Sequence, residues 1–118
     1  MIAIRGAITI TEDTPEQVKD ATIELLSEII SRNHLIQKKM VSVLFTATSD
    51  IVSAYPGRFM REGLGIHDVA ILHFQEMNVQ GSLPLCIRVL IHYNDDIDVY
   101  PVYLRGAKSL RPDLEKHQ

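Results

Sequence analysis

The segment Leu85–Tyr93, LCIRVLIHY, places an arginine in the middle of one of the most hydrophobic runs of the chain. An earlier apolar run, Val69–Met77, carries Glu76 near its end. A charged side chain in an apolar setting costs free energy unless it is paired, hydrogen-bonded or put to use. Glu76 and Arg88 therefore predict either a structural ion pair or a functional site, and the two interpretations carry about equal weight.

Apolar runs and alternating patterns predict five strands. In the first strand, isoleucines alternate with small or polar residues, so that Arg5 lies on the face opposite the isoleucines. The five predicted strands cover residues 2–10, 40–48, 69–77, 84–94 and 98–107.

A capped amphipathic pattern over residues 11–35 predicts the main helix. Thr14 is a good N-cap, Pro15 suits the first helical position, and Gln17 completes a capping box. Apolar residues follow at helical spacing and indicate a helix that covers a sheet. A second, short helix is expected around residues 59–62, with Pro56 and Gly57 interrupting an earlier helical turn capped by Ser49.

This order of elements predicts an α+β fold, a five-stranded mixed sheet with helices packed on one face. The 118 residues fit a single domain, 1–118, with residues 108–118 as a partly mobile tail. The other sheet face would carry Arg5, Tyr103 and Arg88 or Glu76, with apolar neighbours. Because such a face needs a cover, a second copy of the same subunit is a natural occupant.

Composition narrows the possible partners and compartments. The net charge of −3 gives no bulk attraction to nucleic acid or to an anionic membrane, and no apolar run reaches the length of a membrane span. The single cysteine, Cys86, allows no internal disulfide. These features favour a cytoplasmic protein that binds a small molecule.

No motif for metal, cofactor or covalent chemistry stands out. The five histidines lack zinc-site spacing, and Cys86 lies in a strand pattern typical of an inert buried thiol. We therefore expect no metal and no cofactor. Arg5, Arg88 and Arg58 or Arg61 exceed what Glu76 can neutralise, which predicts an anion, and a dicarboxylate suits the guanidinium fork.

Three segments carry a resemblance to a known family. They are IRGAITI with the later DTPE, the middle segment QEMNVQGSLPLCIRVL, and the final segment VYLRGAKSLRPDL. Together they resemble the monofunctional chorismate mutases of the trimeric pseudo-α/β-barrel class. The resemblance implies a homotrimer with sites at subunit interfaces and the Claisen rearrangement of chorismate to prephenate in aromatic amino acid biosynthesis.

The resemblance also implies roles for individual residues. Arg88 would face the negative charge that develops on the ether oxygen of chorismate. Glu76 would accept a hydrogen bond from the ring hydroxyl group. Arg5 and Tyr103 would hold a substrate carboxylate. These roles require no covalent catalysis, only positioning and electrostatic stabilisation.

Further substrate-binding positions follow from the same resemblance. Tyr55, Arg58 and Arg61 would close the pocket from the neighbouring subunit, with tyrosine and arginine at the first two positions where phenylalanine and lysine are expected. Leu110 and Arg111 would belong to a tail that settles over the ligand.

Two strand or loop positions depart from the family pattern. His73, which the resemblance places among the substrate-binding residues, stands where a smaller side chain is expected near the site, and Asn78 stands where an aspartate is common.

Two other classes of protein remain open at this point. Trimeric imine or enamine deaminases also use an interface pocket and an arginine for a carboxylate, although they give no reason for Glu76 at this spacing. A non-enzymatic trimer that senses a small dicarboxylate would use the same arginines. Consumption of chorismate would distinguish a chorismate mutase from both of these alternatives.

Overall fold

The computed structural model describes residues 1–117 and contains one five-stranded sheet with the strand order β3-β2-β4-β1-β5. The central strand β4 is antiparallel to β1 and β2, whereas β3 is parallel to β2 and β5 is parallel to β1. The predicted mixed sheet is therefore confirmed. In chain order the elements are β1 (Ile2–Thr9), α1 (Pro15–Asn33), η1 (Gln37–Lys39), β2 (Met40–Ala47), α2 (Pro56–Leu64), β3 (Ala70–Gln75), β4 (Cys86–Tyr93), β5 (Val102–Leu104), η2 (Arg105–Leu110) and η3 (Pro112–His117).

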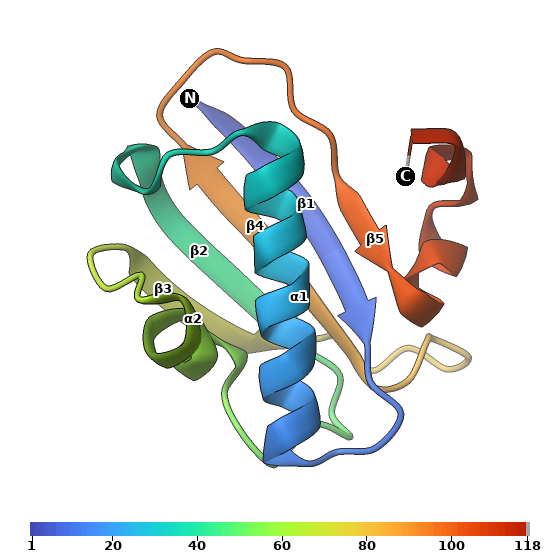
Figure 1. The fold of residues 1–118 in the computed structure, drawn as a ribbon. Helices are drawn as coiled ribbons and strands as arrows, with labels where there is room; N and C mark the ends of the chain where they lie inside the picture. Colours follow the sequence, from blue (N-terminus) through green and yellow to red (C-terminus); the bar gives the residue numbers. More distant parts are fainter. Residues whose placement is uncertain (118) are drawn as a thin grey trace.

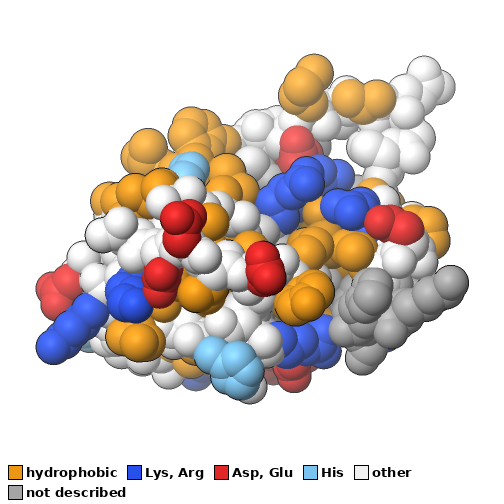
Figure 2. Space-filling view, turned by 90° about the horizontal axis from the view of Figure 1, so that it is seen from above, with side chains coloured by type: hydrophobic (Ala, Val, Ile, Leu, Met, Phe, Trp, Pro, Cys, Tyr) orange, Lys and Arg blue, Asp and Glu red, His pale blue; other side chains and the backbone are white. Residues whose placement is uncertain are grey.

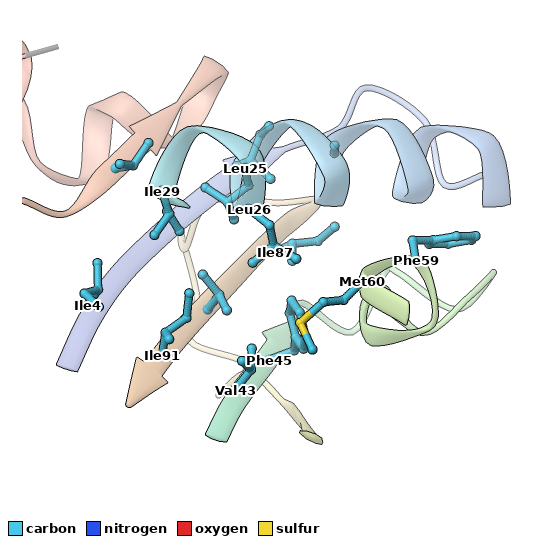
Figure 3. Close-up of a cluster of buried hydrophobic side chains, with 14 of the residues drawn as sticks. Ile4, Leu25, Leu26, Ile29, Val43, Phe45, Phe59, Met60, Ile87 and Ile91 are labelled. Atoms are coloured by element: carbon cyan, nitrogen blue, oxygen red, sulfur yellow. The ribbon is translucent and has the colours of Figure 1, made fainter. Parts of the chain in front are cut away.

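Helices α1 and α2 lie on the same face of the sheet (Figure 1). The core fills the space between them and the strands, with side chains of α1 meeting those of β1, β2 and β4 (Figure 3). Gly6 allows α1 to come close to β1, because a Cβ atom there would lie 2.7 Å from Ile29 Cδ1 and 3.0 Å from the Val102 carbonyl oxygen. The prediction of helices on one face is confirmed.

The start of α1 is fixed by side-chain hydrogen bonds. Thr14 Oγ1 accepts from the Gln17 backbone N–H at 3.1 Å, as predicted for an N-cap. Gln17 Oε1 accepts from the backbone N–H groups of Thr11 at 3.0 Å and Glu12 at 3.1 Å. Gln17 thus closes the turn that precedes the helix.

The second helix begins earlier than predicted. Pro56 is its first residue and Gly57 its second, so this pair opens α2 instead of interrupting a helix. Ser49 and Asp50 form only a single turn, in which the Ile51 N–H donates to the Thr48 carbonyl oxygen at 3.0 Å, and it does not continue into a helix. Gly65 ends α2 in the left-handed conformation with φ of 68°, which a glycine adopts without steric cost.

All five strands are shorter than predicted, and for β5 and β3 the difference affects residues near the candidate site. β5 covers only Val102–Leu104, because Pro101 has no N–H for the ladder and Arg105 turns away with φ of 53°. β3 ends at Gln75, so that Glu76 follows the strand instead of lying inside it.

The chain after β5 forms η2 and η3 and packs beside β1 and β5 (Figure 1). Ala107 and Leu110 of this segment join Ala7, Cys86 and Tyr103 in a small cluster on the sheet face opposite α1. Within residues 1–117, the rest of that face has no helix over it. The partial mobility expected for residues 108–118 stays a prediction, and Gln118 lies outside the described residues.

No helix within residues 1–117 has both the length and the apolar character needed to cross a lipid bilayer. Acidic and basic side chains are interspersed on the surface seen in Figure 2, and hydrophobic side chains reach the surface between them.

Candidate active site

The register of the sheet sets Arg88 in a row with residues of three other strands. Arg88 of β4 lies opposite Ala7 of β1 on one side and opposite Thr46 of β2 on the other, and Ala7 is paired with Tyr103 of β5. Arg5 lies two residues before Ala7 on β1, opposite Leu90. Since alternate residues of a strand share a face, Arg5, Arg88 and Tyr103 share the face that lacks α1.

Glu76 is fixed beside Arg88 by four contacts. Its Oε2 atom lies 3.3 Å from Arg88 Nε and accepts a 2.9 Å hydrogen bond from Thr46 Oγ1. Its Oε1 atom accepts from the Met77 backbone N–H at 3.2 Å, and its own N–H donates to the Ala47 carbonyl oxygen at 2.9 Å. The carboxylate is thus held at the end of β3 and aimed along the sheet face.

The predicted burial of this pair is wrong for the single chain. The side chains of Arg88 and Glu76 keep 48% and 27% of their exposure, respectively. They line an open cavity of about 290 Å³ together with Arg5, Tyr103 and Phe74. The pair is exposed because the described residues provide no layer over this part of the sheet.

The final segment brings Leu110 and Arg111 to the same side of the molecule. Leu110 packs against the cluster that contains Tyr103. The guanidinium carbon of Arg111 lies 5.9 Å from the centre of the Tyr103 ring, and Arg111 Nη2 lies 3.1 Å from Asp113 Oδ2. Six of the ten predicted site residues therefore gather around this sheet face: Arg5, Glu76, Arg88, Tyr103, Leu110 and Arg111.

The other four predicted residues form a second group around α2. Tyr55, Arg58 and His73 line a larger cavity of about 600 Å³ at the ends of β2 and β3. Arg61 is close enough for its positive charge to act on His73. Thr46 and Phe74 border both cavities, which places the two groups on either side of the β3 end of the sheet. One chain does not bring the ten residues into one pocket.

Two ionisable groups near these cavities have displaced pKa values. Burial, together with the charge of Arg61, lowers the pKa of His73 below its ordinary 6.5. Burial raises the pKa of the Cys86 thiol, although the neighbouring Arg88 guanidinium acts in the opposite direction. Cys86 is therefore a neutral thiol near pH 7, in agreement with the prediction that it is inert.

Three residues that hold the site were not predicted. Thr46 could have been found from the alternation of β2, because it follows Ser42 and Leu44 on one face. Asp50 accepts hydrogen bonds from the Leu85 N–H at 3.2 and 3.0 Å, and so anchors the residue that leads into β4 with φ of 49°. Among residues 1–114, whose side chains the structure describes, no group of three His, Cys, Asp or Glu side chains is arranged to hold a metal ion.

Asp13 anchors the loop that leads to α2. Its Oδ2 atom accepts from the Val52 N–H at 3.0 Å, and its Oδ1 atom accepts from the Ser53 N–H at 3.3 Å and the Ser53 hydroxyl at 2.7 Å. These hydrogen bonds lower the pKa of Asp13, with that from Val52 as the main cause. Their partners lie about forty residues away in the sequence, so no local pattern indicates them.

Comparisons with known proteins agree on one family. The family model for chorismate mutase type I matches residues 1–114. Chorismate mutase AroH of Thermus thermophilus is 46% identical over 119 residues, which span 98% of this chain and 97% of that protein. Chorismate mutase AroH of Bacillus subtilis is 39% identical, over 94% of this chain and 90% of that protein. The solved chorismate mutase from Clostridium thermocellum superposes with a TM-score of 0.89 at 38% identity, covering 92% of this chain and 99% of that one.

The contacts of Asp13 predict a pH-dependent effect of Asp13→Asn. Because the pKa of Asp13 is lowered in the folded state, its charge stabilises the fold above the ordinary value of 3.8, and this stabilisation is lost as the pH falls through the folded-state pKa. Asp13→Asn should lower the free energy of unfolding by about 1 kcal/mol at pH 7, and this difference should shrink as the pH falls below the ordinary pKa of 3.8. Urea unfolding of both proteins at one protein concentration measures it. A difference that is independent of pH would contradict the role of the Asp13 charge.

Proposed function

This chain belongs to the chorismate mutase type I family and is a chorismate mutase of aromatic amino acid biosynthesis, and we propose that it rearranges chorismate to prephenate in the cavity that Arg88 and Glu76 line. The observation that carries this proposal is the pairing of Glu76 with Arg88 at 3.3 Å at the edge of an open cavity. A cation and an anion at fixed positions match a reaction in which charge separates within one molecule.

The rearrangement is unimolecular and needs no nucleophile, metal or proton transfer. As the ether C–O bond breaks, negative charge develops on the oxygen, and positive charge develops on the ring. We assign Arg88 to the ether oxygen and Glu76 to the ring hydroxyl group on the opposite side. Both side chains project from a hydrogen-bonded sheet or its end, so they are oriented before the substrate arrives.

Arg5 and Tyr103 are assigned to a substrate carboxylate. Both lie on the Arg88 face, in neighbouring rows of the sheet. Arg111 lies over the Tyr103 ring, and Leu110 packs close by, so the final segment can add a further cation and an apolar cover. A guanidinium group binds a carboxylate through two parallel hydrogen bonds, which fixes the orientation of the substrate.

We further propose that the enzyme is a homotrimer in which each site combines two subunits. The Arg88 group would come from one subunit and the group of Tyr55, Arg58, Arg61 and His73 from its neighbour. Two observations support this. The sheet face around Arg88 lacks a cover within the described residues, and large apolar or aromatic side chains near its β3 edge are exposed: Tyr55, Leu72, Phe74 and Met77.

Assembly would also reduce the solvent exposure of the Arg88–Glu76 pair. Subunit contact would exclude water from the Arg88 cavity, and the interaction between Arg88 and the developing negative charge would strengthen as the local dielectric constant falls. We place this trimer in the cytoplasm, because the only cysteine of the sequence is the buried Cys86 and forms no disulfide within the chain.

The proposed reaction can be followed directly. Addition of chorismate to the purified protein should lead to loss of the chorismate diene absorbance and to formation of prephenate. A protein that binds chorismate without turnover would be a sensor, and one that leaves chorismate unchanged but hydrolyses imines would be a deaminase. Either result would overturn the proposed activity.

Arg88→Ala should reduce turnover much more than substrate affinity. If Arg88 stabilises charge that appears mainly in the transition state, kcat should fall by about 10²–10³, equivalent to about 3–4 kcal/mol. Arg88→Lys keeps the charge but loses the planar fork, so it should also be impaired.

Leu90→Ala, on the same strand and face, is a matched control for altered packing. Circular dichroism and sedimentation must first show that each variant is folded and assembled. An Arg88→Ala enzyme with near-parental kcat and only a raised KM would contradict the assignment.

Mixed subunits test whether each site is shared. Arg88→Ala subunits and subunits carrying Arg58→Ala with Arg61→Ala should each be inactive alone. In a mixed ring of three, one interface joins two intact halves, so random 1:1 mixing by refolding should restore about a quarter of the parental activity. A fully active monomer in sedimentation, or no recovery on mixing, would contradict the shared site.

A further inference from the structure

The imidazole of His73 points toward α2 and away from the sheet face that carries Arg88. Its Nε2 atom accepts a hydrogen bond from the Gly57 backbone N–H at 2.9 Å. The ring stacks on Phe45, with 5.4 Å between ring centres and 14° between ring planes. The Tyr55 ring also contacts it in a tilted arrangement, with 5.0 Å between ring centres and 54° between ring planes. His73 therefore contacts β2, the first turn of α2 and the loop before it.

Gly57 makes this close approach possible. A Cβ atom at position 57 would lie 2.7 Å from His73 Cε1 and 2.9 Å from Ile71 Cγ2. Any larger residue at position 57 would collide with the imidazole, which gives a packing reason for glycine in the first turn of α2. The backbone of α2 thus rests directly on the imidazole, and the hydrogen bond joins β3 to the start of the helix.

The hydrogen bond exists in only one protonation state. Nε2 can accept from the Gly57 N–H only when it carries no proton itself, which makes the ring neutral with its proton on Nδ1. If Nε2 carried a proton, the Gly57 N–H and the Nε2–H would be two donors facing each other, and no hydrogen bond could form between them. The titratable groups that face the ring are Tyr55 from the loop and Arg61 from α2, with Arg58 on the same cavity; Phe45 from β2 is uncharged.

We propose that His73 is a positioning residue, whose neutral imidazole fixes the first turn of α2 and so holds Tyr55, Arg58 and Arg61 in place to bind the substrate. This inference rests on the proposed function, in which the α2 group binds part of chorismate. It reassigns His73 from direct contact with the substrate to support of the helix that makes the contact. Burial and the charge of Arg61 keep the pKa of His73 low, which maintains the neutral state near pH 7.

The direction of the pH effect separates a positioning role from a binding role. If His73 bound the dianionic substrate directly, its protonation would add a positive charge and lower KM. If it positions α2, protonation removes the Gly57 hydrogen bond and raises KM. The carboxylates of chorismate, with ordinary carboxyl pKa values of about 4, stay ionised between about pH 5 and pH 8.

The experiment measures KM and kcat for chorismate between about pH 5 and pH 8 in the parent, His73→Gln and His73→Leu. For the parent, KM should rise about fivefold as the pH falls from 8 to 5, with a midpoint below pH 6.5, while kcat stays nearly constant. His73→Gln offers an amide oxygen that accepts without titrating, so its KM should be close to that of the parent at pH 8 and independent of pH. His73→Leu has no acceptor, so its KM should be raised at every pH.

His67→Gln is the matched control, because His67 is exposed in the loop before β3. It should retain both the parental KM and its pH dependence. A parental KM that falls in acid, or that shows the same pH dependence in His73→Gln, would overturn the positioning role.

A second readout is independent of activity. In ¹H–¹⁵N spectra without substrate, the Gly57 amide signal should shift with the titration of His73 in the parent and should not shift in His73→Gln. If this titration is present but chorismate is not consumed, the proposed function fails and the His73–Gly57 link stands. If chorismate is consumed but the Gly57 signal does not titrate, the link fails and the proposed function stands.

Discussion

The register of β4 between β1 and β2 is the constraint on which the site depends. Its alternation sends Ile87, Val89 and Ile91 toward α1 and leaves Arg88 on the other face. A slip by one residue would exchange the two faces, placing the guanidinium group beneath α1 and exposing isoleucines. The apolar core thus determines the position of Arg88, whose charge we propose to be catalytic.

The same division between faces leaves the Arg88 cavity of a single chain open to solvent. The helical face is closed by α1 and α2, and its side chains are almost fully buried. The opposite face holds Arg5, Glu76 and Arg88 with only the η2 corner covered within the described residues. A folded subunit can therefore be stable before its charges are desolvated. In the proposed trimer, assembly would exclude water from Arg88 and so strengthen its interaction with the substrate.

The sequence predicted those features that depend on local pattern. The Thr14 cap and the alternation of β1 correctly indicated α1 and the face of Arg5. The start of α2 was predicted wrongly because proline both ends and begins helices, and only packing decides which. The hydrogen bond from the Ser53 N–H to Asp13 joins residues forty positions apart, so no local sequence pattern predicts it. The roles proposed for Arg88 and Glu76 came from family resemblance, whereas the separation of the predicted site residues into two groups is visible only in the three-dimensional structure.

The orientation of His73 shows how much one further strand position depends on tertiary context. Alternation along β3 puts Leu72 and Phe74 together and His73 on the other face, but only the parallel pairing with β2 shows which face meets α2.

The two groups of candidate site residues are held in place by two different kinds of support. Arg88 projects from a central strand whose ladder hydrogen bonds hold it in every protonation state. Arg58 and Arg61 project from a nine-residue helix whose start rests on one neutral imidazole. A charge that must meet a developing charge needs the more rigid support, because any rearrangement during the reaction would add to the barrier. Groups that bind substrate before the reaction can tolerate a support that depends on pH, because its loss lowers affinity and leaves the catalytic step intact.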